Sequence, residues 1–202
     1  YFLSGTQFIS MSTAEVLTTI PGNTATTTEK VSMASNGAFG DQIALVDGTY
    51  GYVFNGTNLA LITDVDFPVN PTSIHYMDGV AILTVANSGI WYISDTNDFT
   101  GWVATQFANA ERDPDNLVTA EVNNRDIMLF GDFTTEVGTN TGGNPFPFEA
   151  YPNGLFDKGC AAKNSVAKAN DFVYWLSQDR RGSVQFLKAK GISYKPVSSK
   201  AL

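Results

Sequence analysis

The densest group of side chains capable of chemistry lies near the middle of the chain. Glu111, Asp113 and Asp115 occupy alternate positions, and Arg112 stands between the first two. Such neighbouring carboxylates can hold a divalent cation or divide acid and base roles in hydrolysis. The same segment contains Pro114, and an Asp-Pro-Asp-Asn run starts turns through hydrogen bonds between side chain and backbone. We therefore interpret Glu111, Pro114 and Asp115 as a structural turn motif.

Outside this acidic segment, the sequence gives little support for a metal site or a catalytic triad. His75 is the only histidine, which excludes a site with two imidazole ligands and makes a Ser-His-Asp triad depend on one residue. It stands in an alternating run, so we expect it to face the side of a strand opposite Ile74. Asp64 and Asp66 lack the glycine and distal glutamate of a calcium loop, which favours a solvated turn. The sequence predicts no metal and no cofactor.

A third chemistry to test is glycoside hydrolysis. Residues 94–102 resemble the Asp-box turn of sialidases, but Asp95 is one place early and the central glycine is missing. A sialidase also needs several arginines that converge on a carboxylate, because the recognition is bidentate. The chain has only four arginines, two of which are adjacent. Trp91, Tyr92 and Trp102 could stack on sugars, but aromatic side chains in strands more often fill cores.

Composition narrows the function classes further. Charged residues make up 16% of the chain and the net charge is −8. The longest basic cluster is Arg180-Arg181, which argues against a general nucleic-acid groove, because phosphate binding needs concentrated positive charge. Cys160 is the only cysteine, so an intrachain disulfide is excluded, and we expect its side chain to be buried. No apolar run reaches the roughly 18 residues of a membrane span.

These residues must be positioned by short strands. Around the acidic turn, residues 117–122, 127–130 and 134–137 are apolar or β-branched runs separated by Asn, Gly and Asp, the pattern of an antiparallel meander. The same order recurs along the chain, and Asp47-Gly48 and Asn55-Gly56 are further hairpin signals. Only residues 107–112 and 159–168 could hold a turn or two of helix.

The meander repeats at a regular period. The second strands start near Ile43, Val80, Ile127 and Val173, and the spacings are 37, 47 and 46 residues. A repeat of about 40–50 residues with about four strands is typical of a β-propeller blade. A β-sandwich is the alternative fold. The side chains predicted to be buried are Ile43, Leu45, Val80, Ile82, Ile127, Leu129, Val173 and Trp175.

The predicted fold class is therefore all-β, a propeller-like array of four-stranded antiparallel blades. The chain would form a single β-propeller domain, residues 1–202, or part of one. The blade-like repeats lie near residues 1–30, 31–68, 69–115, 116–160 and 161–202.

Several stretches, which cover most of the chain from about Val31 onward, carry a resemblance to a known family. They are Val31-Ser32-Met33-Ala34 with Asn36-Gly37, Ala110-Glu111 with Pro114-Asp115, Arg125-Asp126, Phe130-Gly131, Thr135-Glu136, Thr141-Gly142, Lys158-Gly159-Cys160 and Ser198-Ser199. With these stretches the chain resembles the packaged-DNA stabilisation proteins of short-tailed phages. Members of that family are longer, and the chain opens directly on a strand and stops without a closing signal, so we expect a segment of a longer protein.

The resemblance implies a virion structural protein rather than an enzyme. Such proteins form a tail hub, a ring of commonly six copies below the portal and its adaptor, which carries the tail needle and tailspikes and helps keep the packaged DNA inside. The implied location is the virion tail, assembled in the host bacterial cytoplasm, without a membrane. An acidic chain is compatible with DNA that passes through the lumen without sequence-specific binding, because like charges repel. The alternative function is a carbohydrate-binding or glycoside-hydrolysing propeller similar to sialidases.

A ring subunit must present contact surfaces to its neighbours. We expect these surfaces on two loops, residues 21–28 and 139–152. The second loop contains Phe146 and Phe148 beside prolines that rigidify it. These two side chains are the candidate protein-interface residues, because aromatic rings dominate interface hot spots. The alternative is that they plug the space between two blades.

Overall fold

The computed structural model describes residues 1–25, 30–110, 115–144 and 146–197. Helix in the described part is limited to α1 (Gly37–Gly40) and the 3-10 turn η1 (Lys163–Ser165). The prediction of an all-β chain is confirmed. The helical turn expected at residues 107–112 is wrong for 107–109, which end a strand; residues 111–112 lie outside the described residues.

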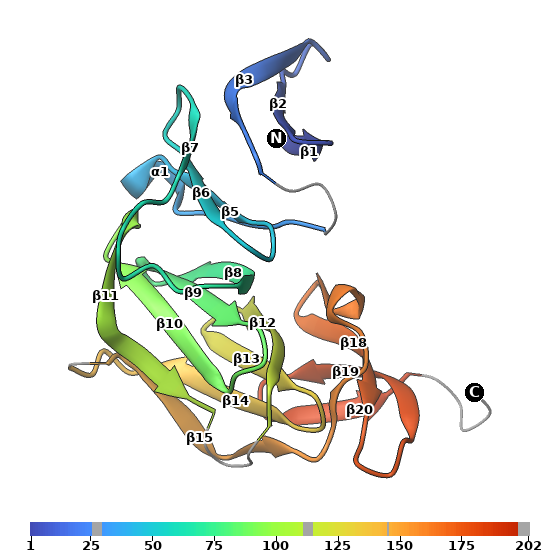
Figure 1. Cartoon of the computed structure of the whole chain (residues 1–202). Helices are drawn as coiled ribbons and strands as arrows, with labels where there is room; N and C mark the ends of the chain where they lie inside the picture. Colours follow the sequence, from blue (N-terminus) through green and yellow to red (C-terminus); the bar gives the residue numbers. More distant parts are fainter. Residues whose placement is uncertain (26–29, 111–114, 145, 198–202) are drawn as a thin grey trace. The chain divides into compact units, whose positions relative to one another are not determined.

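The strands form five sheets that follow one another along the chain (Figure 1). Sheet 1 contains β1 (Phe2–Ser4), β2 (Gln7–Met11) and β3 (Leu17–Asn23); sheet 2 contains β4 (Ser32–Ser35), β5 (Ile43–Val46), β6 (Gly51–Phe54) and β7 (Leu59–Leu61). Sheet 3 contains β8 (Pro71–Met77), β9 (Val80–Val85), β10 (Ile90–Asp95) and β11 (Asp98–Asn109); sheet 4 contains β12 (Leu117–Asn123), β13 (Asp126–Gly131), β14 (Thr135–Asn140) and β15 (Phe148–Phe156). Sheet 5 contains β16 (Gly159–Cys160), β17 (Ala167–Ala169), β18 (Phe172–Gln178), β19 (Val184–Lys190) and β20 (Ser193–Pro196).

The order within each of sheets 1 to 4 is that of a simple meander, in which every strand pairs with its neighbour in sequence. Sheet 5 differs, because β16 and β17 both pair with β18. β16 lies inside the range predicted for the fourth repeat but hydrogen-bonds into the fifth sheet.

The chain divides into two compact units. One comprises residues 1–83 and 93–105, and the other comprises residues 84–92 and 106–202. Strands β9, β10 and β11 of sheet 3 contribute residues to both units. A single propeller domain therefore remains a prediction.

Asn, Asp and Gly set the turns where the backbone must take positive φ. Asp78 and Gly79 join β8 to β9 with φ of 49° and 96°, the combination that a two-residue hairpin turn with right-handed twist requires. The Asn36-Gly37 pair does not form a hairpin turn, because Asn36 precedes the short helix α1 and Gly37 is its first residue. The Asn36 side chain instead exchanges two hydrogen bonds with Gln42, at 2.7 Å to its backbone amide and 3.0 Å to its side-chain oxygen.

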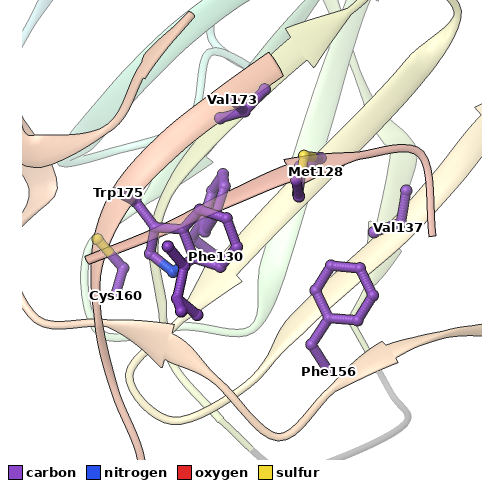
Figure 2. Close-up of a cluster of buried hydrophobic side chains, with 9 residues drawn as sticks. Met128, Phe130, Val137, Phe156, Cys160, Val173 and Trp175 are labelled. Atoms are coloured by element: carbon purple, nitrogen blue, oxygen red, sulfur yellow. The ribbon is translucent and has the colours of Figure 1, made fainter. Parts of the chain in front are cut away.

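The cores lie between consecutive sheets. In the first unit Phe8 of sheet 1 is buried against Leu45, Tyr52, Phe54 and Leu59 of sheet 2. In the second unit, sheet 4 packs on sheet 5 through a cluster that Figure 2 shows, with Phe130 and Trp175 at its centre. Of the eight side chains predicted to be buried, seven are, and Ile43 is half-buried. In β9 and β13 nearly every residue is buried, so these strands are covered on both faces, whereas β18 alternates between buried and half-buried residues.

A buried hydroxyl in the first core gives a testable pH dependence. Tyr52 is 3% exposed and donates a hydrogen bond of 3.0 Å to the Asp47 carboxylate. Burial is the main cause that raises the pKa of Tyr52 to about 12; the hydrogen bond from the Ala25 amide lowers it, and Asp47 raises it further.

We expect Tyr52 to ionise near pH 12 in the folded protein, against about 10 when unfolded. Because the folded pKa is the higher one, its contribution to stability is complete below pH 10 and is lost as the pH rises through 12. Ultraviolet titration of the tyrosines measures the step, and Tyr52→Phe should remove it. An unchanged titration curve in that variant would contradict the assignment.

Candidate functional site

Both candidate interface residues, Phe146 and Phe148, lie in one aromatic cluster. Phe148 opens β15 and is 7% exposed, while Phe146 is half-buried in the preceding loop. Trp91 of β10 contacts both rings edge-on, with centroids 5.0 Å from Phe146 and 5.4 Å from Phe148. Within this unit the two rings are therefore packed on the chain's own tryptophan, the arrangement of a plug between sheets.

The loop that we expected at residues 139–152 is shorter than predicted. Its first two residues end β14 and its last five begin β15, and Asn140 pairs with Phe148 across the sheet. Phe148 occupies a paired strand position for that reason. Of the other expected contact loop, residues 21–23 end β3 and residues 26–28 lie outside the described residues.

A cavity of about 270 Å³ adjoins the aromatic cluster. Trp91 and Phe148 form one part of its wall, and Ile127 and Leu129 of β13 form another. Among the described residues, its lining also includes the carboxylates Glu136 and Glu149 and the amide of Asn109, but no arginine. The described part of its wall offers apolar surface with a few acceptor oxygens and no group that would pair with a substrate carboxylate.

The acidic turn is partly described. Glu111 and Pro114 lie outside the described residues. Asp115 is half-buried, and its Oδ2 accepts hydrogen bonds from the Phe133 amide at 2.7 Å, the Thr134 amide at 2.8 Å and the Thr134 hydroxyl at 3.1 Å. One carboxylate thus holds the turn between β13 and β14. With its near oxygen occupied by three donors, Asp115 is positioned as a structural acceptor.

Asp115→Ala is expected to lower the free energy of unfolding by about 2–3 kcal/mol, because it leaves two backbone amides of a tight turn without their acceptor. Asp115→Asn retains one acceptor oxygen, and we expect about half that loss. Urea denaturation followed by tryptophan fluorescence measures both. Equal stability of the alanine variant and the parent chain would show that the turn does not depend on this carboxylate.

The segment Lys158-Gly159-Cys160 carries the chain from sheet 4 into sheet 5. The Lys158 ammonium group pairs with Asp179 at 2.8 Å, and the Lys158 carbonyl accepts the Thr135 hydroxyl at 2.6 Å. The Gly159 carbonyl accepts the indole N–H of Trp175 at 3.0 Å. Cys160 is buried as expected, and burial raises the pKa of its thiol, so it remains protonated at neutral pH. The segment is a structural crossover.

The described arginines do not all converge: Arg180 and Arg181 line one cavity together with Lys158, whereas Arg125 lies apart from them. Arg125 lies in the turn before β13, whereas Arg180 lines a cavity with Asp132 and Phe133 just beyond the other end of that strand. A six-residue strand separates them by about 17–20 Å. The guanidinium of Arg180 sits over the Phe133 ring, 5.5 Å from its centroid. This spacing does not form the arginine cluster that a sialidase uses to hold a carboxylate.

The Asp-box-like stretch forms the hairpin between β10 and β11. Burial alone would raise the pKa of Asp98, but hydrogen bonds from Thr100 and from Gln42 outweigh it and lower the pKa below its ordinary value. The backbone amide of Trp102 donates to Asp64 at 3.1 Å, and its indole N–H donates to the Phe99 carbonyl at 2.9 Å. These polar groups stabilise a turn, and Trp102 is buried rather than available for stacking on a sugar.

The described residues contain no candidate metal cluster and no helix that could cross a membrane. Among those residues no three His, Cys, Asp or Glu side chains are gathered closely enough to hold a metal ion. His75 is half-buried in β8, and Ile74 beside it is fully buried, as strand alternation predicts. No helix in this part of the chain has the length and hydropathy to span a membrane.

The five consecutive antiparallel sheets are the pattern of a protein built from repeated blades. Comparison with family models identifies the family. The whole chain, residues 1–202, matches the family described as Bacteriophage P22 Gp10, beta-propeller. The chain belongs to this family. Membership of the P22 Gp10 family confirms the resemblance to phage packaged-DNA stabilisation proteins and the propeller-like fold class. The chain is accordingly a phage structural protein concerned with DNA stabilisation, a component of the virion.

Several solved structures are similar to this member of the P22 Gp10 family, but only distantly. The computationally designed Ika4 protein is 12% identical, with 79% of this chain and 91% of that chain covered and a TM-score of 0.45. Hsv2 of Kluyvelomyces marxianus is 8% identical (83% and 47% covered, TM-score 0.46), and Hsv2 of Kluyveromyces lactis is 12% identical (80% and 47% covered, TM-score 0.45). The chain thus spans about half the length of the Hsv2 structures. No curated protein sequence matches it significantly.

Proposed function

We propose that this chain works as a non-catalytic subunit of a phage tail hub. In this proposal copies of it form a ring, commonly of six, that connects the portal and its adaptor to the tail needle and tailspikes. The ring helps retain the packaged DNA, which passes through the lumen without sequence-specific binding. Assembly takes place in the host bacterial cytoplasm, and the ring becomes part of the virion tail. The match to the P22 Gp10 family over residues 1–202 is the observation that carries the proposal.

The geometry of the described residues supports a role without catalysis. The Asp115 carboxylate is engaged in holding a turn, and Arg125 and Arg180 lie beyond opposite ends of one strand. The described lining of the cavity beside Trp91 contains two carboxylates and no cation that would bind an acidic sugar. A carbohydrate-binding or glycoside-hydrolysing propeller is therefore the less favoured candidate. Robust cleavage of sialosides by the purified chain would overturn the preference.

Phe146 and Phe148 provide the test of the assembly role. We expect Phe146→Ser with Phe148→Ser, introduced into the protein as the phage makes it, to reduce tail-complete, DNA-filled particles at least ten-fold. The control is Val65→Ser with Val69→Ser, which removes two apolar side chains that are 97% and 78% exposed. Electron microscopy counts tails, and nuclease-resistant DNA measures genome retention.

A second measurement separates folding from assembly. Because both rings pack on Trp91, the aromatic double variant also loses apolar contacts within the chain. Circular dichroism of the purified variant shows whether it still folds. A folded variant that yields no tails would identify the two residues as partner anchors, whereas an unfolded one would identify them as core. Normal particles with normal DNA content would reject both roles.

A further inference from the structure

Three Asn-Gly pairs occur in the sequence, and the structure places them in three different surroundings. They are Asn36-Gly37, Asn55-Gly56 and Asn153-Gly154. Such a pair can react with itself, because glycine has no Cβ to shield its backbone nitrogen. The glycine nitrogen attacks the side-chain carbonyl carbon of the asparagine, a succinimide ring closes, and the side-chain nitrogen leaves as ammonia with the proton that the glycine nitrogen loses. Water then opens the ring to aspartate or isoaspartate, and no electron is transferred.

The Asn55 side chain is folded over the turn between β6 and β7. Its Oδ1 accepts hydrogen bonds from the backbone amides of Thr57 at 3.0 Å and Asn58 at 3.1 Å. These bonds close an Asx turn, in which the side-chain carbonyl group curls over the peptide group that follows the asparagine. The carbonyl carbon of Asn55 is therefore held beside the nitrogen of Gly56, and this proximity favours ring closure.

The same two amides favour the transition state of ring closure. When the Gly56 nitrogen attacks, negative charge develops on Oδ1 of Asn55. Two backbone N–H groups directed at such an oxygen stabilise the charge, as they do in an oxyanion hole. Both donors already lie at hydrogen-bond distance from this oxygen, so the turn needs little rearrangement to assist the reaction.

The nucleophile and the leaving group of this pair are accessible. Among the described residues, none accepts a hydrogen bond from the Gly56 amide or from Nδ2 of Asn55. Both residues are exposed. In the direction of a Cβ atom at Gly56, the nearest atom is a carboxylate oxygen of Asp41 at 4.0 Å, so this side of the turn is open. Water can therefore reach the ring and hydrolyse it.

Asn36-Gly37 has the opposite surroundings. Asn36 is 1% exposed, and its Nδ2 donates to the Gln42 side-chain oxygen at 3.0 Å and to the Asn97 carbonyl at 3.2 Å. The Gly37 amide donates to the Ser35 hydroxyl at 3.1 Å. Nucleophile and leaving group are both engaged and water is excluded, so we expect this pair to be inert while the chain is folded.

Asn153-Gly154 lies inside β15 and has an exposed side chain on a confined backbone. Gly154 is buried, and a Cβ atom there would meet the carbonyl oxygen of Val137 in β14. Ring closure requires the backbone to rotate between the asparagine and the glycine. A strand packed this closely on its neighbour opposes the rotation, so we expect this pair to react slowly.

We propose that Asn55-Gly56 is a self-modification site, at which the folded chain converts Asn55 to aspartate and isoaspartate. The substrate is the chain itself, and water is the co-reactant. The site does not depend on the hub role. The reaction adds one negative charge to the turn, and isoaspartate also adds one carbon to the main chain. Because the turn joins Phe54 and Leu59, which are both buried in the core between sheets 1 and 2, the product should loosen that core.

Peptide mapping by mass spectrometry tests the site. The purified full chain is kept at mildly alkaline pH, and each Asn-Gly peptide is followed for the mass gain of deamidation and for isoaspartate. We expect Asn55 to react at least ten-fold faster than Asn36, and several-fold faster than Asn153. A rate at Asn55 no higher than at either of the other two pairs would overturn the proposal.

Unfolding in urea separates the effect of the turn from that of the dipeptide. Asn36 and Asn153 lose their protection in urea, so both should react faster there than in the folded chain. Asn55 should react at least as fast folded as unfolded, because only the folded turn holds its carbonyl oxygen between two amide donors. A lower rate at Asn55 in the folded chain would show that the turn protects it and would contradict the proposal.

Neutral hydroxylamine captures the intermediate, because it cleaves the chain at a succinimide. The folded parent chain should yield fragments 1–55 and 56–202. Asn55→Ser is the matched variant, since its hydroxyl oxygen can still accept from the turn amides but offers no carbonyl carbon to attack. We expect it to give neither fragment, with circular dichroism unchanged. Absence of the two fragments from the parent chain, or their persistence in the folded serine variant, would reject the site.

Discussion

Replacing Trp175 by alanine is expected to lower the free energy of unfolding by about 3–5 kcal/mol, the usual cost of emptying a buried aromatic site. Trp175 is fully buried and packs edge-on against Phe130, with centroids 5.3 Å apart. It lies in the cluster between sheets 4 and 5, and its indole N–H is the donor to the Gly159 carbonyl. Truncation therefore opens a cavity and leaves a buried acceptor unpaired. Urea denaturation monitored by far-ultraviolet circular dichroism measures the loss.

Two variants separate the contributions of the Trp175 side chain. Trp175→Phe retains most of the ring volume and loses the hydrogen bond, so we expect a smaller loss of about 1–3 kcal/mol. Phe107→Ala removes an aromatic ring that is 45% exposed, and its loss should stay below about 1 kcal/mol. If Trp175→Ala and Phe107→Ala cost the same, the contact between sheets 4 and 5 would not be a principal source of stability.

The second large effect is expected for Gly159→Ala. A Cβ atom at this position would meet the backbone of Asp132 and Phe133. Because backbone cannot move aside as a flexible side chain can, the crossover must shift, and overpacking of this kind costs about 3 kcal/mol or more. The matched control is Gly182→Ala, where φ is +76° but the space is open, so only the left-handed backbone cost of about 1–2 kcal/mol applies.

The two glycine variants therefore differ in the cause of the destabilisation as well as in its magnitude. Thermal unfolding scans of both should give the lower midpoint for Gly159→Ala. Tryptophan fluorescence gives a second measurement. The shift at residue 159 also displaces the carbonyl oxygen that accepts the hydrogen bond of the Trp175 indole, so the emission maximum of Gly159→Ala should move to longer wavelength. Equal midpoints would show that the crossover accommodates a methyl group.

The strand repeat was readable from the sequence because it depends on local chemistry. Asp78-Gly79 supplies the backbone conformations of a tight hairpin, and alternation placed Val173 and Trp175 on the core side. Details that depend on distant residues were not readable. Asn36 is tied to Gln42 instead of forming a simple turn, and Phe148 is fixed in a strand by pairing with Asn140. No local pattern specifies either partner.

The candidate sites show the same division. The acidic segment predicted a turn, but nothing local indicates that Asp115 holds the distant turn at Phe133 and Thr134. The two phenylalanines were identified from their type, whereas their packing on Trp91 depends on the approach of separate strands. The basic character of residues 158–202, with nine basic residues and two acidic ones, was missed because the net charge of −8 averages over opposite segments. Counting charges segment by segment would have found it.

The pairing of strands with their sequence neighbours has a consequence for how the chain opens. Each of sheets 1 to 4 closes its hydrogen bonds within one short stretch of sequence, so one sheet can lose its backbone pairing without breaking a ladder in the next. Sheet 5 is tied together more tightly, because residues 159, 167 and 184 all belong to strands that pair with β18. Amide hydrogen exchange should therefore proceed in sheet-sized steps, with the amides of β18 among the last to exchange and those of sheet 1 among the first.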